Sequence, residues 1–252
     1  VASSRELLDK EQGDLWDSGQ VHSDESVHIV YDGKTLITGQ KCFWKVRLAD
    51  EQGNWTSWSE PAYWQMGLFA DDWSAHWIGS AEMESQSVGG RPVDNKMFDP
   101  WFRKTFTLTE SLKEALIYVA SIGYHELYVN GCKIGNAVLA PSVTDHKSRA
   151  RYVTYDISHY LKKGENVIAL WLGTSWAVFP AYQRNDKPAI PMALAQAEIT
   201  LTSGSKVRVI TDGSWKTHAS PNVLMGYWDA HHFAGEFYDA SLEINGWNEA
   251  GF

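Results

Sequence analysis

Two carboxylates near the end of the chain, Glu236 and Asp239, have the residue type and close spacing that glycoside hydrolysis uses. In such chemistry one carboxylic acid donates a proton to the leaving group while a second carboxylate activates water. Neighbouring side chains on a strand alternate between faces, so these two groups do not converge on one bond. We therefore expect a structural role, in which Tyr238 and Asp239 tie the last strand to a neighbouring loop.

The sequence lacks the other common catalytic and metal-binding patterns. His231 and His232 are adjacent, so on a strand their rings point apart, and there is no Cys-x-x-Cys or His-Glu-x-x-His. A Gly-x-Ser-x-Gly elbow and a glycine-rich phosphate loop after a strand are also missing. We expect neither zinc nor a serine nucleophile, and we assign no catalytic residue to the chain.

Charge and composition narrow the class of protein. The 252 residues carry a formal net charge of -9, which argues against nucleic acid and against anionic membranes as partners. The 13 Trp and 11 Tyr suit both β-sandwich cores and stacking on sugar rings. There is no apolar run of membrane-spanning length and no signal-peptide pattern at Val1. We expect a soluble chain whose true amino terminus lies upstream; localisation stays open, with the periplasm or the extracellular space favoured.

The two cysteines, Cys42 and Cys132, fall in different predicted domains. A disulfide framework is therefore not expected. We interpret both side chains as thiols that pack inside their domains.

Residues 1–68 have the alternating pattern of a small β-sandwich. Strands are predicted at 26–31, 42–48 and 62–66, separated by turns with glycine. The first strand is expected to be cut short at Val1. The Trp44 strand and the Trp58-Ser-Glu-Pro segment resemble a fibronectin type III or immunoglobulin-like module, in which a buried Trp anchors two sheets.

Residues 69–79 are predicted as a linker and 80–252 as a second, all-strand domain. Ser80 to Pro100 is predicted as a long loop, and Asn130-Gly131 between alternating apolar runs predicts a β-hairpin. A single helical turn is expected at 157–161. The regular strand spacing suits a jelly roll, with strands at 101–108, 115–121, 125–129, 153–156, 166–173, 193–202, 206–211 and 237–242.

The order of motifs in both domains resembles a known family. The motifs are Leu15-Trp-Asp-Ser-Gly19, Tyr31-Asp-Gly33, Trp44-Lys-Val-Arg47, Met66-Gly-Leu68, Gly123-Tyr-His-Glu-Leu-Tyr-Val-Asn-Gly131, Leu139-Ala-Pro141, Arg151-Tyr-Val-Thr-Tyr-Asp-Ile157, Gly164-Glu-Asn-Val-Ile168, Leu172-Gly-Thr-Ser-Trp176 and Gly235-Glu-Phe-Tyr-Asp-Ala240. Together they are similar to the N-terminal β-sandwich region of bacterial α-L-rhamnosidases of glycoside hydrolase family 78.

This resemblance implies a non-catalytic fragment. In the family the acid and the base belong to a helical barrel that follows the sandwich region, so the barrel of the same polypeptide is the expected partner. The fragment would then support the barrel and shape its substrate entrance, without hydrolysing rhamnosides alone. No cofactor would be required for this role.

The resemblance also implies a second reading, an autonomous module that binds rhamnose-like sugars in glycans or glycosides. Some related modules hold L-rhamnose through calcium, which prefers oxygen ligands. Asn136, Asn185 and Asp186 would supply the oxygens, and these residues with Trp176, Phe179 and Tyr182 are the candidate sugar contacts. Four of these residues have a structural alternative: Asn136 as a turn residue, Trp176 as a core side chain and Asn185-Asp186 as part of a polar turn.

Overall fold

The computed structural model describes all residues except 81–95, 147, 175–176, 178–189 and 226–234. The chain divides into two compact units, Val1–Trp73 and Ser74–Phe252. The division lies within the segment 69–79, which the sequence predicts as a linker. Within the described residues, no helix has the length and apolar character needed to cross a bilayer.

The first unit contains a short helix and a two-stranded antiparallel sheet. Helix α1 (Arg5–Asp9) begins at Ser4, whose side chain accepts a hydrogen bond from the Leu7 N–H at 3.2 Å. Strand β1 (Lys41–Trp44) pairs with β2 (Ala62–Gln65), and Ala2 forms an isolated antiparallel bridge with Phe43. The sequence analysis did not predict α1.

Three expectations for this unit were wrong. The predicted strand 42–48 ends at Trp44, the last residue of β1. Residues 26–31 form no strand, because their side chains are largely exposed and no neighbouring strand pairs with them. Trp44 is 38% exposed rather than a buried anchor. The buried apolar residues of this unit are Ala2, Leu8, Leu15, Cys42 and Leu68.

A ladder of cations and aromatic rings stabilises the extended hairpin beyond β1. The Arg47 guanidinium lies 4.8 Å from the Trp55 ring and 4.5 Å from the Trp58 ring, and the Lys45 ammonium lies 4.7 Å from Trp58. Cations over indole faces attract the ring quadrupole. Trp55, which is 46% exposed, therefore stabilises this unit through its contact with Arg47 and not by burial in a core.

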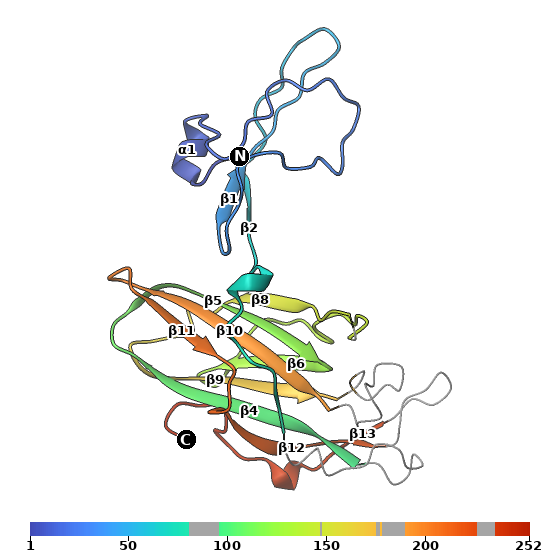
Figure 1. The fold of residues 1–252 in the computed structure, drawn as a ribbon, viewed down its shortest axis with the longest axis vertical. Coiled ribbons are helices and arrows are strands. Elements are labelled where there is room, and N and C mark those ends of the chain that lie inside the picture. Colours follow the sequence, from blue (N-terminus) through green and yellow to red (C-terminus); the bar gives the residue numbers. More distant parts are fainter. Residues whose placement is uncertain (81–95, 147, 175–176, 178–189, 226–234) are drawn as a thin grey trace. The chain divides into compact units, whose positions relative to one another are not determined.

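The second unit is a sandwich of two antiparallel sheets, confirming the predicted all-β jelly-roll architecture (Figure 1). The five-stranded sheet contains β11 (Lys206–Ile210), β10 (Met192–Leu201), β5 (Leu112–Ile122), β8 (Tyr152–Asp156) and β3 (Ile78–Gly79). The six-stranded sheet contains β13 (Gly235–Tyr238), β12 (Lys216–Met225), β4 (Lys96–Leu108), β9 (Gly164–Gly173), β6 (Tyr124–Val129) and β7 (Cys132–Lys133).

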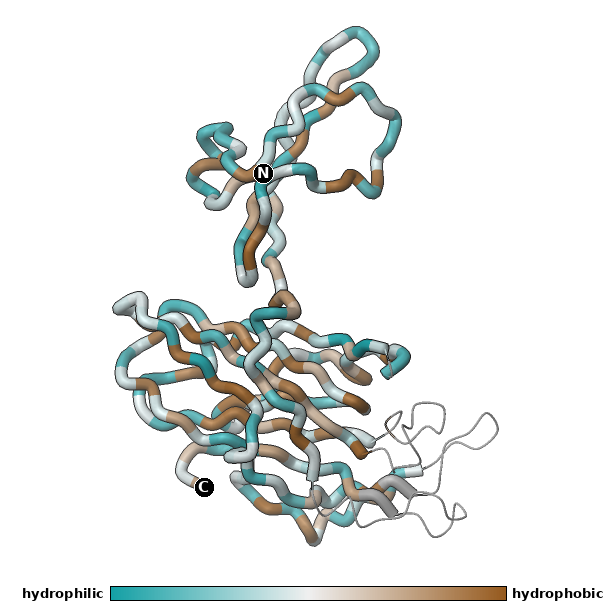
Figure 2. Tube along the Cα trace, in the orientation of Figure 1, coloured by the Kyte–Doolittle hydropathy of each residue, from teal (hydrophilic) through white to brown (hydrophobic). Residues whose placement is uncertain are grey.

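The core lies between these two sheets. Ile117 and Val119 of β5 meet Phe102 of β4 and Ile168 and Leu170 of β9, all at most 2% exposed. Hydrophobic residues gather along the strands of the two sheets (Figure 2). Strand β6 alternates buried and partly buried residues, whereas the middle of β5 and of β9 is buried on both faces. Tight interlocking of these apolar faces is the main stabilising contribution to the unit.

The structure corrects the sequence analysis of this unit at three places: a loop, the end of a strand and a strand that was missed. The predicted loop Ser80–Pro100 is wrong from Lys96 onward, because β4 begins there. The predicted strand 237–242 ends at Tyr238, and residues Ala240–Leu242 form the 3-10 helix η5. Strand β12 was not predicted; Pro221 lies where its register against β4 shifts, which disguised the strand pattern.

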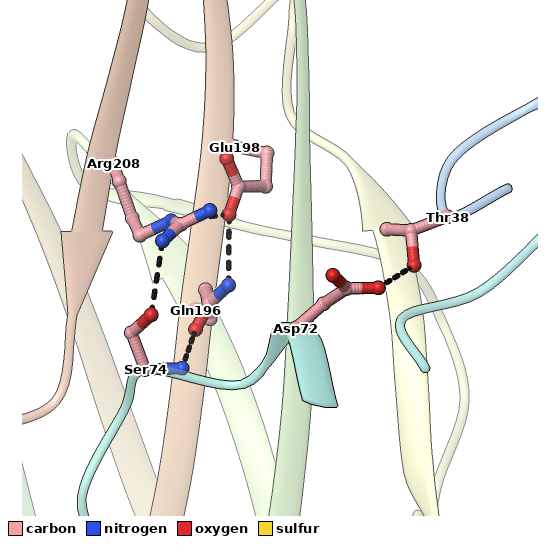
Figure 3. A network of polar contacts seen from close by, with 6 residues as sticks. All are labelled: Thr38, Asp72, Ser74, Gln196, Glu198 and Arg208. Atoms are coloured by element: carbon pink, nitrogen blue, oxygen red, sulfur yellow. Dashed lines mark hydrogen bonds and ion pairs between the residues drawn. The ribbon is translucent and has the colours of Figure 1, made fainter. Parts of the chain in front are cut away.

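The start of the second unit is fixed by side chains of β10 and β11. The Ser74 N–H donates to Gln196 Oε1 at 2.7 Å, and Arg208 donates to Ser74 Oγ at 2.9 Å (Figure 3). Glu198 accepts from both Gln196 and Arg208, at 2.8 and 2.6 Å. Within the first unit, Asp72 of the 3-10 helix η1 (Ala70–Asp72) accepts a hydrogen bond from Thr38.

The predicted Asn130-Gly131 hairpin is present between β6 and β7. Asn130 has φ of 49° and Gly131 has φ of 83°, which a type I′ turn needs. The Asn130 amide also donates to Tyr160 O at 2.7 Å and to Asn166 Oδ1 at 2.9 Å, and its oxygen accepts from the Val167 N–H at 2.9 Å. Asn130 therefore joins the hairpin to the turn before β9.

The variant Asn130→Gly tests this second role, because glycine keeps the turn conformation and removes only the side chain. Losing three hydrogen bonds is expected to lower the free energy of unfolding by about 2 kcal/mol, measured by urea denaturation. The control is Asn136→Gly, at an exposed loop position, which is expected to change it by less than about 0.5 kcal/mol. Equal stability of both variants would contradict the role.

Candidate functional site

The predicted sugar and calcium residues are only partly within the described structure. Asn136 is exposed in the loop after β7, next to Gly135 with φ of 75°. The other candidates lie outside the described residues; they are Trp176, Phe179, Tyr182, Asn185 and Asp186. No cluster of three or more His, Cys, Asp or Glu that could hold a metal ion occurs among the residues described.

The carboxylates Glu236 and Asp239 do not form a catalytic pair in the structure. Glu236 is exposed on β13, opposite Leu224. Asp239 caps η5, accepting hydrogen bonds from the Ser241 N–H at 3.0 Å and the Ser241 hydroxyl at 2.6 Å. Tyr238 donates to Glu243, and the Asp239 N–H donates to Pro221 O at 3.1 Å. These contacts tie β13 to its neighbours.

Asp99 on β4 is the one buried carboxylate in the described part of the chain, at 2% exposed. One oxygen accepts from the Thr174 N–H at 2.7 Å and the Thr174 hydroxyl at 2.5 Å, and the other accepts from the Asn222 amide at 2.5 Å. Burial raises its pKa from 3.8 to about 6, against the opposing effect of these hydrogen bonds. The nearby Glu236 carboxylate raises it further.

A pKa of about 6 is suitable for a general acid, but Asp99 is not positioned as one. Both its oxygens are occupied by donors of the protein itself, and the side chain is removed from solvent. Its role is to join β4 to the end of β9 and to β12. Sequence reasoning missed Asp99 because the predicted loop Ser80–Pro100 contained it, and no local pattern distinguishes it.

A second buried polar group joins β5, β6 and β8. His125, at 4% exposed, lies with Nδ1 2.9 Å from Ser121 Oγ and Nε2 3.0 Å from the Tyr155 hydroxyl. The Ser121 hydroxyl donates to Gly123 O at 3.2 Å. We therefore assign the Nδ1-protonated tautomer, in which Nδ1–H donates to Ser121 and Nε2 accepts from Tyr155.

This Ser-His pair is structural rather than nucleophilic. Burial lowers the pKa of His125 from 6.5 to about 4, so the imidazole is neutral at neutral pH. Ser121, at 1% exposed, is inaccessible to a substrate. The group pairs its buried polar atoms and joins β6 of the six-stranded sheet to β5 and β8 of the five-stranded sheet.

The thiols differ from the prediction that both are packed. Cys42 is buried, and desolvation raises its pKa, as expected for a packing thiol. Cys132 is exposed on β7, so the prediction was wrong for this residue. Strand β7 has only two residues and lies at the edge of its sheet, which leaves the side chain in solvent.

Two family models match the chain. Residues 110–252 match "Alpha-L-rhamnosidase N-terminal domain", and residues 1–70 match "Rha78A-like, N-terminal immunoglobulin domain". Together they cover most of both compact units, and the second match supports the predicted immunoglobulin-like character of the first unit.

The relatives that match nearly the whole chain include several proteins named α-L-rhamnosidase. An α-L-rhamnosidase of Formosa agariphila is 33% identical over 260 residues, which cover 100% of this chain and 27% of that protein. The structure of an α-L-rhamnosidase from Dictyoglumus thermophilum has 35% identity and a TM-score of 0.84, covering 99% of this chain and 28% of the other. The chain thus spans about a quarter of the length of these relatives.

A more distant structure shares the fold. The α-L-rhamnosidase of Streptomyces avermitilis, complexed with L-rhamnose, has 20% identity and a TM-score of 0.82. The alignment covers 100% of this chain and 40% of that one. At this identity the likeness concerns the fold alone.

Proposed function

Because this chain belongs to the family of α-L-rhamnosidase N-terminal domains, we propose that it is the non-catalytic sandwich region of an enzyme that hydrolyses terminal α-L-rhamnosides. The observation that carries the proposal is the match of the whole chain to about a quarter of proteins named α-L-rhamnosidase. In this proposal the bond-breaking residues lie elsewhere in the polypeptide. The sandwich supports that catalytic region and shapes its substrate entrance.

The polar groups of the second unit support a scaffolding role. Glycoside hydrolysis needs two carboxyl groups across the scissile bond, separated by about 5 to 9.5 Å. In the described residues the buried carboxylate of Asp99 is committed to Thr174 and Asn222, and Asp239 is committed to Ser241. Hydrogen bonding of this kind makes strands rigid rather than leaving an acid free to react.

The test is release of the phenol from an aryl α-L-rhamnoside, measured for the 252-residue chain and for the full-length gene product at equal concentration. We expect turnover by the full-length protein and none above background by the chain alone. Turnover by the 252 residues would overturn the non-catalytic assignment. Absence of turnover by the full-length protein on several α-L-rhamnosides would overturn the enzyme assignment.

Rhamnose binding by the chain itself is the alternative function. The support is the L-rhamnose complex of the Streptomyces avermitilis relative, which has the same fold. The proposed ligands are those named from the sequence, with Asn136 exposed at the loop after β7. Calorimetric titration of the chain with millimolar L-rhamnose, with and without calcium, measures it. No heat in either titration would remove this alternative and leave the scaffold.

A further inference from the structure

The segment Ile244–Phe252, which we call the strap, packs on part of the outer face of the six-stranded sheet, against β4, β6 and the hairpin after β6. On β4, Trp101 and Arg103 alternate with Phe102, which faces the core. On β9, Val167 and Ala169 alternate with Ile168 and Leu170 of the core. All four outer residues are at most 8% exposed, although they lie outside the core between the sheets. The sheet is therefore buried on both faces here.

Aromatic stacking and a buried cation hold the strap. Trp247 stacks on Trp101 with ring centroids 4.5 Å apart and an interplanar angle of 9°. Arg103 donates to the main-chain oxygens of Glu249 and Phe252, both at 3.1 Å, and its guanidinium lies 5.0 Å from the Phe252 ring. Burial removes the Arg103 guanidinium from water, which the fold tolerates because this planar group donates to two oxygens at once.

The strap also contacts the hairpin at the edge of the sheet. The Gly131 N–H donates to Asn248 O at 2.9 Å, and Tyr128 of β6 packs edge-on against Trp247 at 5.7 Å. A Cβ at Gly131 would come within 3.0 Å of the Glu249 side chain. The main chain of the strap is therefore held from both β4 and the hairpin, and it ends beside β4 (Figure 1).

This face is incomplete within the described residues. The Phe252 ring is 60% exposed, although one side of it rests on Arg103. An additional polypeptide that covers the exposed side of the Phe252 ring would continue the apolar contacts of the strap.

We propose that the strap and the adjacent Asn130–Cys132 turn form the docking surface for the polypeptide that follows Phe252. The proposal rests on the function proposed above, in which a catalytic region belongs to the same polypeptide. Because Arg103 fixes the main-chain oxygen of Phe252, the next residues start at this face. A tethered segment has a high effective concentration near its point of attachment, which favours this surface over others. Arg103 is thus a positioning residue.

The exposed thiol of Cys132 is a natural reporter for this surface. It follows Gly131, which is bonded to the strap, whereas the other cysteine, Cys42, is buried in the other unit. We would measure the reaction of Cys132 with a disulfide reagent in the 252-residue chain and in the full-length protein, both carrying Cys42→Ala. We expect a rate at least tenfold slower in the full-length protein. Equal rates would overturn the proposal.

Substitutions on β4 distinguish the loss of the strap contacts from a general loss of stability. Arg103→Met in the full-length protein is expected to return the Cys132 rate to within about twofold of the short chain. The matched control is Lys104→Met, the next residue of the strand, which bonds Ser214 rather than the strap; it should keep the slow rate. Should Arg103→Met fail to fold, Phe252→Ser changes an exposed ring and is expected to raise the rate as well. No acceleration in either variant would overturn the proposal.

The outcomes distinguish this proposal from the proposed function. A full-length protein that hydrolyses an aryl α-L-rhamnoside while Cys132 remains fully reactive would overturn the docking surface and leave the function intact. A full-length protein in which Cys132 is protected but which hydrolyses no α-L-rhamnoside would overturn the function and leave the docking surface intact.

Discussion

The variant His125→Asn is expected to lack a pH effect that the native protein has. In the native protein, His125 lowers the free energy of unfolding by about 3 kcal/mol as the pH falls from 6.5 to 4. In the folded protein burial lowers the His125 pKa to about 4, against 6.5 for an exposed imidazole. Between these values the unfolded chain binds a proton that the folded chain does not. The contribution is therefore present above pH 6.5 and is lost as the pH falls toward 4.

Asparagine suits this test because its amide can still donate to Ser121, as Nδ1–H does in the assigned tautomer. The variant loses the acceptor for the Tyr155 hydroxyl, so we expect it to be less stable at pH 7 by about 1–2 kcal/mol. Below pH 6.5 its stability should fall less steeply than that of the native protein. Urea denaturation at several pH values, followed by tryptophan fluorescence, measures both effects.

The control is His159→Asn, at an exposed position in the turn before β9. Because this side chain is outside the buried cluster, the substitution should change the free energy of unfolding at pH 7 by less than about 0.5 kcal/mol. If His125→Asn and the native protein have the same slope between pH 6.5 and 4, the imidazole is not the group that takes up the proton. The assignment of a neutral, buried histidine would then be wrong.

The variant Asp99→Asn is expected to have the opposite effect on the pH dependence of the free energy of unfolding, also of about 3 kcal/mol. The folded-state pKa of Asp99 is raised to about 6 from 3.8. Between these values the folded chain holds a proton that the unfolded chain has lost, so stability from this group falls as the pH rises from 3.8 to 6. Above pH 6 the native protein carries the full cost of burying the charge.

Asparagine removes that charge while its oxygen can still accept from Thr174. The Asn222 amide would turn over, so that its oxygen accepts from the side-chain amide introduced by the substitution. Relative to the native protein, Asp99→Asn should therefore gain stability at pH 7 and become more sensitive to acid. A variant that is less stable than the native protein at about pH 7 and at about pH 4.5 alike would show that the ionised carboxylate is essential to the cluster.

The two groups act against each other over nearly the same pH range. His125 makes the fold less stable as the pH falls, and Asp99 makes it more stable, so their combined contribution between pH 4 and 6 is close to zero. The double variant should then recover a slope near that of the native protein. The two side chains lie on different strands and hydrogen-bond to different partners, so additivity within about 0.5 kcal/mol is expected.

Patterns along the chain determined the architecture of the second unit. Alternation of apolar and polar residues located strand β6, and Asn130-Gly131 located the hairpin between β6 and β7. These features depend on the side-chain period of a strand and on the positive φ of a tight turn, which are properties of short segments. The sequence also sufficed for the family, because the order of its motifs is a linear property.

Local patterns failed where another part of the chain decides the conformation. Strand β12 contains Pro221, and only its pairing with β4 and β13 makes it a strand. Conversely, residues 26–31 alternate like a strand but have no neighbour to pair with. Strand formation depends on cross-strand contacts more than on the preference of one segment, and a single sequence does not state which segments meet.

The polar groups of the sandwich were decided by the tertiary structure alone. Asp99 meets Thr174 and Asn222, which lie 75 and 123 residues away in the sequence, and Arg103 meets Phe252 at a separation of 149. Nothing near these residues in the chain marks them, because a buried charge is defined by the groups that exclude water from it. The sequence determined which segments form the sheets and which family they belong to; only the packing of the sheets and the strap determined where charge is buried.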